Sequence, residues 1–234
     1  MAALLIIFAK EPIAGQVKTR LSPPLSLKAA ARLYHYFLED ILEEMGRLPA
    51  ITLAVAYSPA GAENFFRQIA PPQALLFPQE GDDLTTRLVR AFARGFAGGF
   101  KQVLARNSDS PDLPGEIVQA GEQALKEDGV DLVLSPSPDG GYNLVGLRKP
   151  RPRLFQGISW SSARVLSDTL DLARQQALAV HLLPAWPDID TMDDLRAFAA
   201  RPLAPDAPGR RSHLYAQELL AGPLSEKLKT ENCI

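Results

Sequence analysis

Short apolar runs alternate along the chain with longer segments in which apolar side chains recur at helical spacing. The runs are too short for core helices, and their apolar content is typical of strands buried on both faces of a parallel sheet. We expect such strands at 3–8, 51–57, 101–105 and 131–134, with a weaker one at 74–77.

The segments between these runs are predicted to be helices. In the longest, the apolar residues from Leu33 to Met45 line one side of a helix, and Ser26 can cap its N-terminus. Further helices are expected at 63–69, from 82–83 onward, and at 115–126. Strands and helices that alternate with short connections predict a mostly parallel sheet with helices on both faces.

The alternation loosens after residue 135. A strand at 142–147 follows the previous one closely, which predicts a hairpin-like or mixed-sheet insertion. A helix at 161–175, a strand at 179–183, a helix at 192–199 and a last helix near 212–220 complete the pattern. We expect one α/β domain over 1–201 and a C-terminal extension over 202–234 that ends in a polar tail.

Composition excludes several classes of protein. The 25 Lys and Arg residues and the 27 Asp and Glu residues leave a net charge of −2, so no global basic field is available to bind nucleic acid. The single cysteine excludes intrachain disulfides and cysteine-based zinc sites. The first apolar run is too short to span a bilayer and lacks the basic leader of a signal peptide, so we expect a cytoplasmic protein without a membrane span.

A charged loop follows the first strand, with the sequence KEPIAGQVKTRL at 10–21. Cations that follow a buried parallel strand, together with a flexible glycine, are typical of anion sites in α/β proteins. Lys18 and Arg20 would project to the same side of an extended segment, and we expect them to join Lys10 on one diphosphate group, with Gly15 in the same loop. The alternative is a solvated loop with ordinary surface cations.

Two acidic segments follow later strands. In RNSDSPDLP at 106–114, Asp109 and Asp112 are candidate ligands for a hard divalent cation, Mg²⁺ or Mn²⁺. The alternative is that Asp112 or Ser110 caps the next helix, whereas Asp109 lies too early to do so. In WPDIDTMDDL at 186–195, Thr191 is the expected helix cap. Of its four aspartates, Asp193 and Asp194 are expected to be structural. Asp190 is a better second metal ligand than Asp188.

Two further loops carry candidate ligand contacts. Asp139, Gly140 and Gly141 form a strong turn signal that a plain hairpin explains, although paired glycines also allow a ligand to approach the backbone. Before the helix that starts near 83, Gln79 and Gly81 are candidates to contact a nucleotide base or phosphate. The arginines at 87, 90 and 94 form a helical stripe that is more often a solvated face.

Taken together and in order, these segments resemble the GT-A superfamily of nucleotide-diphospho-sugar transferases. Within it, the chain resembles a bacterial family of small uncharacterised members, some assigned as glycosyltransferases of arsenosugar biosynthesis. The matching segments, which span about residues 3–200, are FAKEPIAGQVKTRL at 8–21, GDDLTTRL at 81–88, SDSPDL at 108–113, DGGYNLVGL at 139–147, FQGISW at 155–160 and DIDTMDDL at 188–195.

The resemblance implies a single-domain, Rossmann-like GT-A fold and a metal-dependent transfer of a sugar from a nucleotide-diphosphate sugar to a small-molecule acceptor. Catalytic roles would fall to Asp109, Asp139 and Lys18, and the metal, Mg²⁺ or Mn²⁺, to Asp109 and Asp190. The expected nucleotide contacts are Phe8, Lys10, Gly15, Lys18, Arg20, Gln79, Gly81, Arg87 and Ser108. The expected sugar or acceptor contacts are Gly140, Gly141, Tyr142 and Trp160.

Two other functions stay open at the level of sequence. Sugar-phosphate nucleotidyltransferases share the fold and much of the first loop, so the chain can instead join a nucleoside triphosphate to a phosphorylated acceptor. A non-catalytic nucleotide-binding module is the third reading, because Arg106 and Asn107 replace the apolar residue and glycine that usually precede the Ser-Asp pair in the family. The base, sugar and acceptor are left open.

Overall fold

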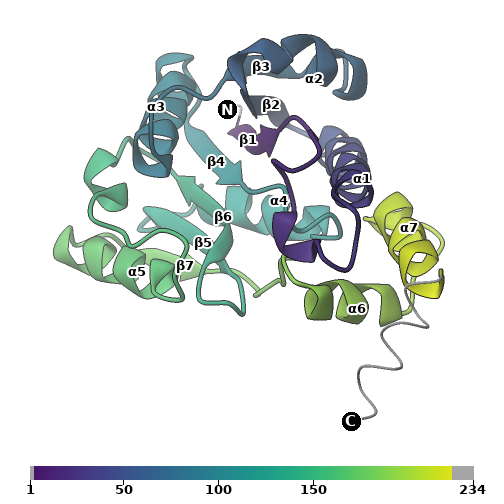
Figure 1. Ribbon diagram of the computed structural model, residues 1–234. Helices are drawn as coiled ribbons and strands as arrows, with labels where there is room; N and C mark the ends of the chain where they lie inside the picture. Colours follow the sequence, from purple (N-terminus) through teal and green to yellow (C-terminus); the bar gives the residue numbers. More distant parts are fainter. Residues whose placement is uncertain (1–2, 223–234) are drawn as a thin grey trace.

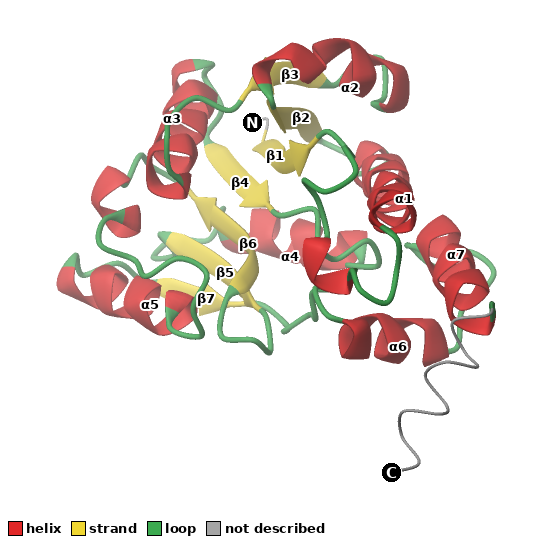
Figure 2. Cartoon of the chain, viewed as in Figure 1, coloured by secondary structure: helices red, strands yellow, loops and turns green. Residues whose placement is uncertain are grey.

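The computed structural model describes residues 3–222, and the predicted polar tail at 223–234 lies outside the described residues. A seven-stranded sheet forms the centre of the molecule (Figures 1 and 2), in the order β3-β2-β1-β4-β6-β5-β7. Its strands are β1 (Ala3–Lys10), β2 (Ile51–Ser58), β3 (Leu75–Pro78), β4 (Gln102–Arg106), β5 (Leu132–Pro136), β6 (Tyr142–Leu147) and β7 (Val180–Leu182). Only β6 runs antiparallel to its neighbours β4 and β5. The predicted mixed, mostly parallel sheet is confirmed.

Helices cover both faces of the sheet. One face carries α1 (Leu27–Gly46), α2 (Glu63–Ile69), α4 (Gly115–Ala124), α6 (Met192–Ala200) and α7 (Arg210–Ala221), and the other carries α3 (Leu84–Ala97) and α5 (Val165–Gln175). Strand β1 shows why both faces are covered: Leu5 and Ile7 pack into one core, while Leu4 and Ile6 pack into the other. The apolar run of this strand therefore has no solvent-facing side.

Helix boundaries follow the caps that the sequence predicts. The Ser26 hydroxyl accepts a hydrogen bond from the backbone of Ala29 at 3.1 Å, and Thr191 forms a reciprocal capping box with Asp194. The helix predicted at 161–175 begins only at Val165, because Ser161 has a left-handed backbone with φ of 61° that a helix does not accommodate.

The C-terminal helix α7 packs against α1 and α6 (Figure 1). The buried carboxylate of Asp40, on α1, accepts hydrogen bonds from the backbone and hydroxyl of Ser212 at 2.8 and 2.6 Å. Arg211 adds ion pairs to Asp40 and Glu43. The division of the chain at residue 201 stays a prediction. No helix within residues 3–222 has the length and apolarity to cross a membrane, and cytoplasmic location stays a prediction.

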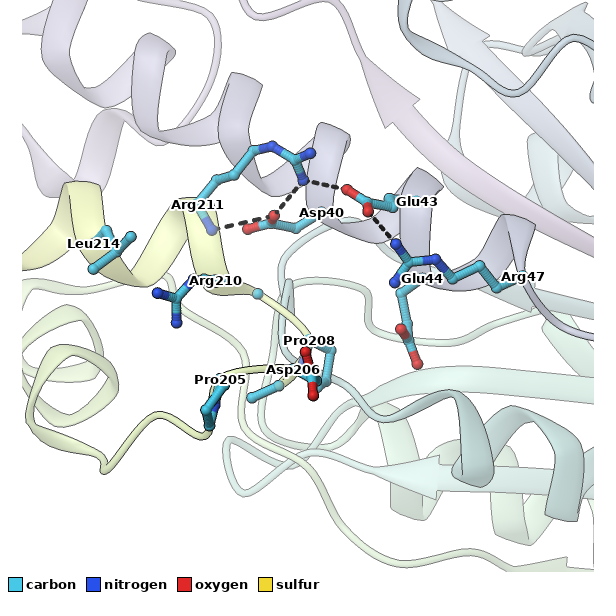
Figure 3. Close-up of a pocket in the computed structure, with 12 residues that line it drawn as sticks. Asp40, Glu43, Glu44, Arg47, Pro205, Asp206, Pro208, Arg210, Arg211 and Leu214 are labelled. Carbon is cyan, nitrogen blue, oxygen red and sulfur yellow. Dashed lines mark hydrogen bonds and ion pairs between the residues drawn. The ribbon is translucent and has the colours of Figure 1, made fainter.

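A pocket of about 380 Å³ lies between α1 and α7 (Figure 3). Four of its charged residues pair with one another: Arg211 contacts Asp40 and Glu43, and Arg47 also contacts Glu43. None of the site residues predicted from sequence lines this pocket.

Candidate functional site

The predicted site residues gather at one edge of the sheet, where the parallel strands end. There the loop after β4 meets the segment that leads into α6, because the backbone N–H of Ile189 donates to the carbonyl of Asp109 at 2.9 Å. In Figure 1 the purple turn that follows β1 lies against the start of α6. Three segments that are far apart in the sequence therefore share one small region.

Lys18 is the centre of this region. Its Nζ lies 2.5 Å from Oδ1 of Asp109, 2.8 Å from Oδ1 of Asp190 and 2.7 Å from the carbonyl oxygen of Ile189. The Lys18 side chain is 4% exposed, whereas those of Asp109 and Asp190 are 36% and 39% exposed. We call these three oxygens and the space that they enclose the oxygen cradle. Its carboxylates face solvent, and its occupant is a buried ammonium group.

The cradle keeps Lys18 charged. Burial by itself disfavours an ammonium group, but the two carboxylates outweigh that effect and raise the pKa of Lys18 above its ordinary value. The charge of Lys18 is therefore retained throughout the neutral pH range, and it balances part of the negative charge of Asp109 and Asp190.

The loop that carries Lys18 is not extended, so the prediction that Lys18 and Arg20 project to the same side of an extended segment is wrong. Lys18 has a left-handed backbone with φ of 47°, and residues Thr19–Leu21 form a short 3₁₀ turn. Buried Val17 and Leu21 anchor this turn on either side. The side chain of Lys18 points inward as a result, while Arg20, like Lys10, is exposed.

A second aspartate supports the loop that holds Asp109. Oδ1 of Asp188 accepts hydrogen bonds from Nδ2 of Asn107 at 3.0 Å and from the hydroxyl of Ser110, on the two sides of Asp109. Burial, together with the nearby charge of Asp109, raises the pKa of Asp188 to about 6. Asp188 thereby ties the two segments that carry Asp109 and Asp190 to one another.

Arg106 lies beneath this loop and not at its surface. Its side chain is buried and donates to the backbone carbonyls of Asn107 at 3.1 Å and Ser110 at 2.6 Å. Burial lowers its pKa to about 10, so the guanidinium remains charged at neutral pH despite its surroundings. Both residues that depart from the family pattern, Arg106 and Asn107, are thus used to shape the loop around Asp109.

A chain of hydrogen bonds joins the end of β1 to the same loop. The backbone N–H of Lys10 donates to the hydroxyl of Tyr34 at 3.1 Å, that hydroxyl lies 2.6 Å from Oγ of Ser108, and Ser108 donates to the carbonyl of Phe8 at 2.9 Å. Burial raises the pKa of Tyr34 to about 12. Sequence reasoning placed Tyr34 in the apolar stripe of its helix, and nothing in its spacing distinguished it from a core residue.

Asp112 does not cap the helix that follows it. Neither Asp112 nor Ser110 caps the helix that follows, since α4 begins after Pro114 without a side-chain cap from its own N-cap residue. Asp112 is buried and accepts from Nε1 of Trp186 at 3.1 Å and from Arg201 at 2.5 Å. The alternative of a helix cap is therefore wrong, because the carboxylate is directed toward Trp186 and Arg201, on the two sides of α6.

The turn between β5 and β6 lies at the same edge of the sheet. Asp139 is exposed, and its Oδ1 accepts from the backbone of Gly141 at 2.9 Å, as expected in a tight turn. Gly140 has φ of 90°, and a Cβ there would meet the backbone of Ala163. Turn geometry therefore accounts for Gly140, and contacts of Asp139, Gly140 and Gly141 with a ligand stay predictions.

The remaining predicted nucleotide contacts, Gln79, Gly81 and Arg87, lie near the ends of β1 and β2. Nε2 of Gln79 donates to the carbonyls of Ala56 and Ala9, which holds it at the ends of β2 and β1. Arg87 donates to the carbonyl of Gly81 at 2.8 Å, and both Gln79 and Arg87 line a pocket of about 60 Å³. Roles for Gln79, Gly81 and Arg87 in nucleotide binding stay predictions.

The two aromatic residues predicted to contact the sugar or acceptor lie next to each other. The rings of Tyr142 and Trp160 are 6.5 Å apart, and the indole N–H of Trp160 donates to Thr85 at 2.8 Å. The structure thus brings Lys18, Asp109 and Asp190 into contact, while Lys10, Arg20 and Asp139 are exposed, and no ion pair joins these three to that group within residues 3–222.

The oxygens of the cradle are of the type that binds divalent cations. Within residues 3–222 no group of three or more His, Cys, Asp or Glu side chains could hold a metal ion. The cradle nevertheless offers two carboxylate oxygens and one carbonyl oxygen that already surround a cationic group, Nζ of Lys18. Hard oxygen ligands of this kind suit Mg²⁺ or Mn²⁺, which take one or two carboxylates and complete their shell with phosphate and water.

The chain is similar to one described protein family and to several solved structures. The family described as "Uncharacterized protein conserved in bacteria (DUF2064)" matches residues 41–162. One solved structure is a protein from Desulfovibrio desulfuricans G20, named a candidate nucleotide-diphospho-sugar transferase. It is 34% identical to this chain, the match covers 93% of this chain and 95% of that protein's chain, and the TM-score is 0.84. Among curated proteins no relative matches the chain.

More distant structures show the fold alone. CMP:2-keto-3-deoxy-manno-octonic acid synthetase, solved with CTP, is 12% identical over 93% of this chain and 100% of its own, with a TM-score of 0.56. A cytidylyltransferase from Leptospira borgpetersenii serovar Hardjo-bovis is 13% identical over 96% of each chain, with a TM-score of 0.54. The Rossmann-like fold expected from the sequence resemblance is confirmed.

Proposed function

The chain belongs to the DUF2064 family of uncharacterized proteins conserved in bacteria, and on that premise we propose that it is a nucleotide-sugar-dependent glycosyltransferase. One observation carries the proposal: Lys18, Asp109 and Asp190 converge at the carboxyl edge of the sheet. The relative from Desulfovibrio desulfuricans, named for the same class of activity, supports it. The reaction moves a sugar from a nucleoside diphosphate to a small-molecule acceptor.

A divalent cation, Mg²⁺ or Mn²⁺, fits the donor set of Asp109 and Asp190. When bound, such a cation neutralises the negative charge of a departing diphosphate. The half-exposed side chains of Asp109 and Asp190 leave this part of the cradle open toward a ligand. Asp188 and Arg106 contribute indirectly, because they hold the loop on which Asp109 lies.

The protein's own side chains supply the remaining functions of the proposed site. Lys18 offers a permanent positive charge to the phosphates, since its pKa is raised. The aromatic pair of Tyr142 and Trp160 is assigned to the sugar, because flat apolar rings pack against the carbon faces of a sugar ring. Asp139 is assigned to the acceptor, as a positioning group or base, and its exposure at the turn leaves the carboxylate accessible.

Nucleotidyl transfer is the second candidate function. Its support is the likeness of the fold to two cytidyl-transferring enzymes, one of them solved with CTP. In that reaction Lys18 would act on the triphosphate, and pyrophosphate would be released. The third alternative is a binding module without catalysis, in which Arg106 and Asn107 would hold the Asp109 loop for binding alone.

A panel of donors with Mn²⁺ or Mg²⁺ tests these alternatives. We expect slow release of nucleoside diphosphate from one of UDP-, GDP-, CDP-, ADP- or dTDP-sugars, even with water as acceptor. Release of pyrophosphate from a nucleoside triphosphate and a sugar phosphate would instead establish nucleotidyl transfer. Tight nucleotide binding without either product would identify a binding module and overturn the proposal.

A further inference from the structure

We propose that Lys18 and a divalent cation are alternative occupants of the oxygen cradle, and that a phosphate-bearing ligand opens the cradle by drawing Lys18 onto its phosphates. The inference rests on the proposed function, because it assumes that Asp109 and Asp190 bind the cation. It adds a mechanism by which binding of the cation and of the nucleotide depend on one another.

The geometry of the cradle makes the two occupants exclusive. The ammonium nitrogen lies within 2.8 Å of all three cradle oxygens, which belong to Asp109, Ile189 and Asp190. A cation that uses the same oxygens has to displace the ammonium group, because two positive charges bound to the same oxygens would repel each other strongly. The carbonyl of Ile189 is a cation ligand in this scheme, in addition to the two carboxylates.

Lys18 leaves the cradle only if another anion receives it. Its side chain is almost fully buried, and a buried ammonium group without a partner is costly. Apart from the cradle, the charged group has one contact among the described residues, the ring of Phe37 at 5.5 Å from its centroid. A phosphate group is the natural partner, since lysine binds phosphate as a point charge on a flexible stem.

An exposed segment of chain leads into the anchored turn that carries Lys18. The preceding residues Ala14, Gly15 and Gln16 are exposed, and Gly15 has φ of 83°. The carboxylates of Asp109 and Asp190, being more than a third exposed, connect the cradle to solvent. A diphosphate that approaches from this side first meets the exposed carboxylates, which contact the buried ammonium group of Lys18. The cradle thus selects ligands that carry phosphate.

The expected consequence is a coupling between two ligands. The cation alone has to compete with Lys18 and binds weakly. A nucleoside diphosphate removes the competitor and adds phosphate oxygens, so each ligand increases the affinity for the other by the same factor. Removal of the ammonium group should therefore free the cation from its dependence on the nucleotide.

Binding of Mn²⁺, followed by electron paramagnetic resonance without any nucleotide, tests the idea directly. The variant Lys18→Met keeps the unbranched stem and removes the charge. We expect it to bind Mn²⁺ at least about tenfold more tightly than the wild-type protein, a factor that corresponds to roughly 1.4 kcal/mol. The matched control Lys28→Met makes the same chemical change at an exposed lysine that is assigned to no site, and its affinity for Mn²⁺ should equal that of the wild type.

A second variant locates the bound ion, and thermal denaturation confirms that each variant is folded. In Lys18→Met combined with Asp190→Asn, the gain in affinity should disappear; a gain that persists places the ion elsewhere and overturns the proposal. Equal Mn²⁺ affinity of Lys18→Met and wild type would also overturn it, while leaving the metal site of the proposed function intact. If neither protein binds Mn²⁺ even with UDP, GDP or CDP, the metal-dependent function fails as well.

Discussion

Replacement of Asp109 by Asn separates a structural role of this residue from a role in binding. The substitution keeps the shape of the side chain and removes its charge. In the folded protein it eliminates one of the two carboxylates that contact Lys18, at 2.5 Å, while Asp190 and the carbonyl of Ile189 still accept from the ammonium. Lys18 therefore stays partnered, and the core beneath it is unchanged.

The cost in stability follows from this geometry. Loss of a buried charge-assisted hydrogen bond is worth about 1.5–3 kcal/mol, but the 36% exposure of Asp109 reduces that value, so we expect roughly 1 kcal/mol. For a chain of this length, such a change lowers the melting temperature by about 2–4 °C. Metal-dependent nucleotide binding should fall far more, by about 100-fold or greater, since even supporting residues of metal sites cost 10–100-fold.

Isothermal titration calorimetry with a nucleoside diphosphate, with and without Mn²⁺, measures the binding loss, and differential scanning calorimetry measures the stability. Asp193→Asn is the matched control: it makes the same chemical change three residues from Asp190, at a side chain that is 90% exposed. The reasoning is refuted if Asp109→Asn unfolds at ordinary temperature or retains the metal-dependent affinity. Either result would make Asp109 a structural residue.

Three further predictions concern the supports of the site. The pKa of Asp188 is raised from 3.8 to about 6, so between these pH values the folded state binds more protons than the unfolded state. The unfolding free energy of the wild type should therefore fall by roughly 2–3 kcal/mol as the pH rises through this range. Asp188→Asn, measured by urea denaturation, should lack this decrease. Tyr34→Phe removes the hydroxyl that accepts from the backbone N–H of Lys10 and contacts the buried Ser108 hydroxyl, and it should lower the unfolding free energy by about 1–3 kcal/mol in the same assay. Gly140→Ala forces a Cβ into the backbone of Ala163 and should lower the melting temperature, whereas an unchanged value would show that the turn can shift.

Secondary structure was largely predictable because its causes are local. The cap formed by Ser26 and the apolar stripe behind it define α1 within a few residues of its observed bounds. The uninterrupted apolar run of β1 required burial on both faces, and both cores contain its side chains. Where a local backbone feature was not visible in the sequence, as with the left-handed Ser161 before α5, the predicted boundary was wrong by several residues.

The edge at which the candidate site lies was also predictable, since parallel strands all end on the same side of a sheet. That rule placed Lys18 and Asp109 in neighbouring loops. It could not show that Lys18 turns inward while Arg20 remains exposed, because this difference depends on the left-handed backbone of Lys18 and on buried neighbours.

The sequence by itself determined the fold class, the order of most elements and the loops from which the chemistry comes, since periodicity, caps and turn residues act over a few positions. Only the tertiary structure decided which charges meet. The pairing of Lys18 with Asp109 and Asp190, and the support of the Asp109 loop by Arg106 and Asp188, join segments that are distant in the chain. Such contacts depend on how packed elements bring their ends together, and no local pattern of residues encodes them.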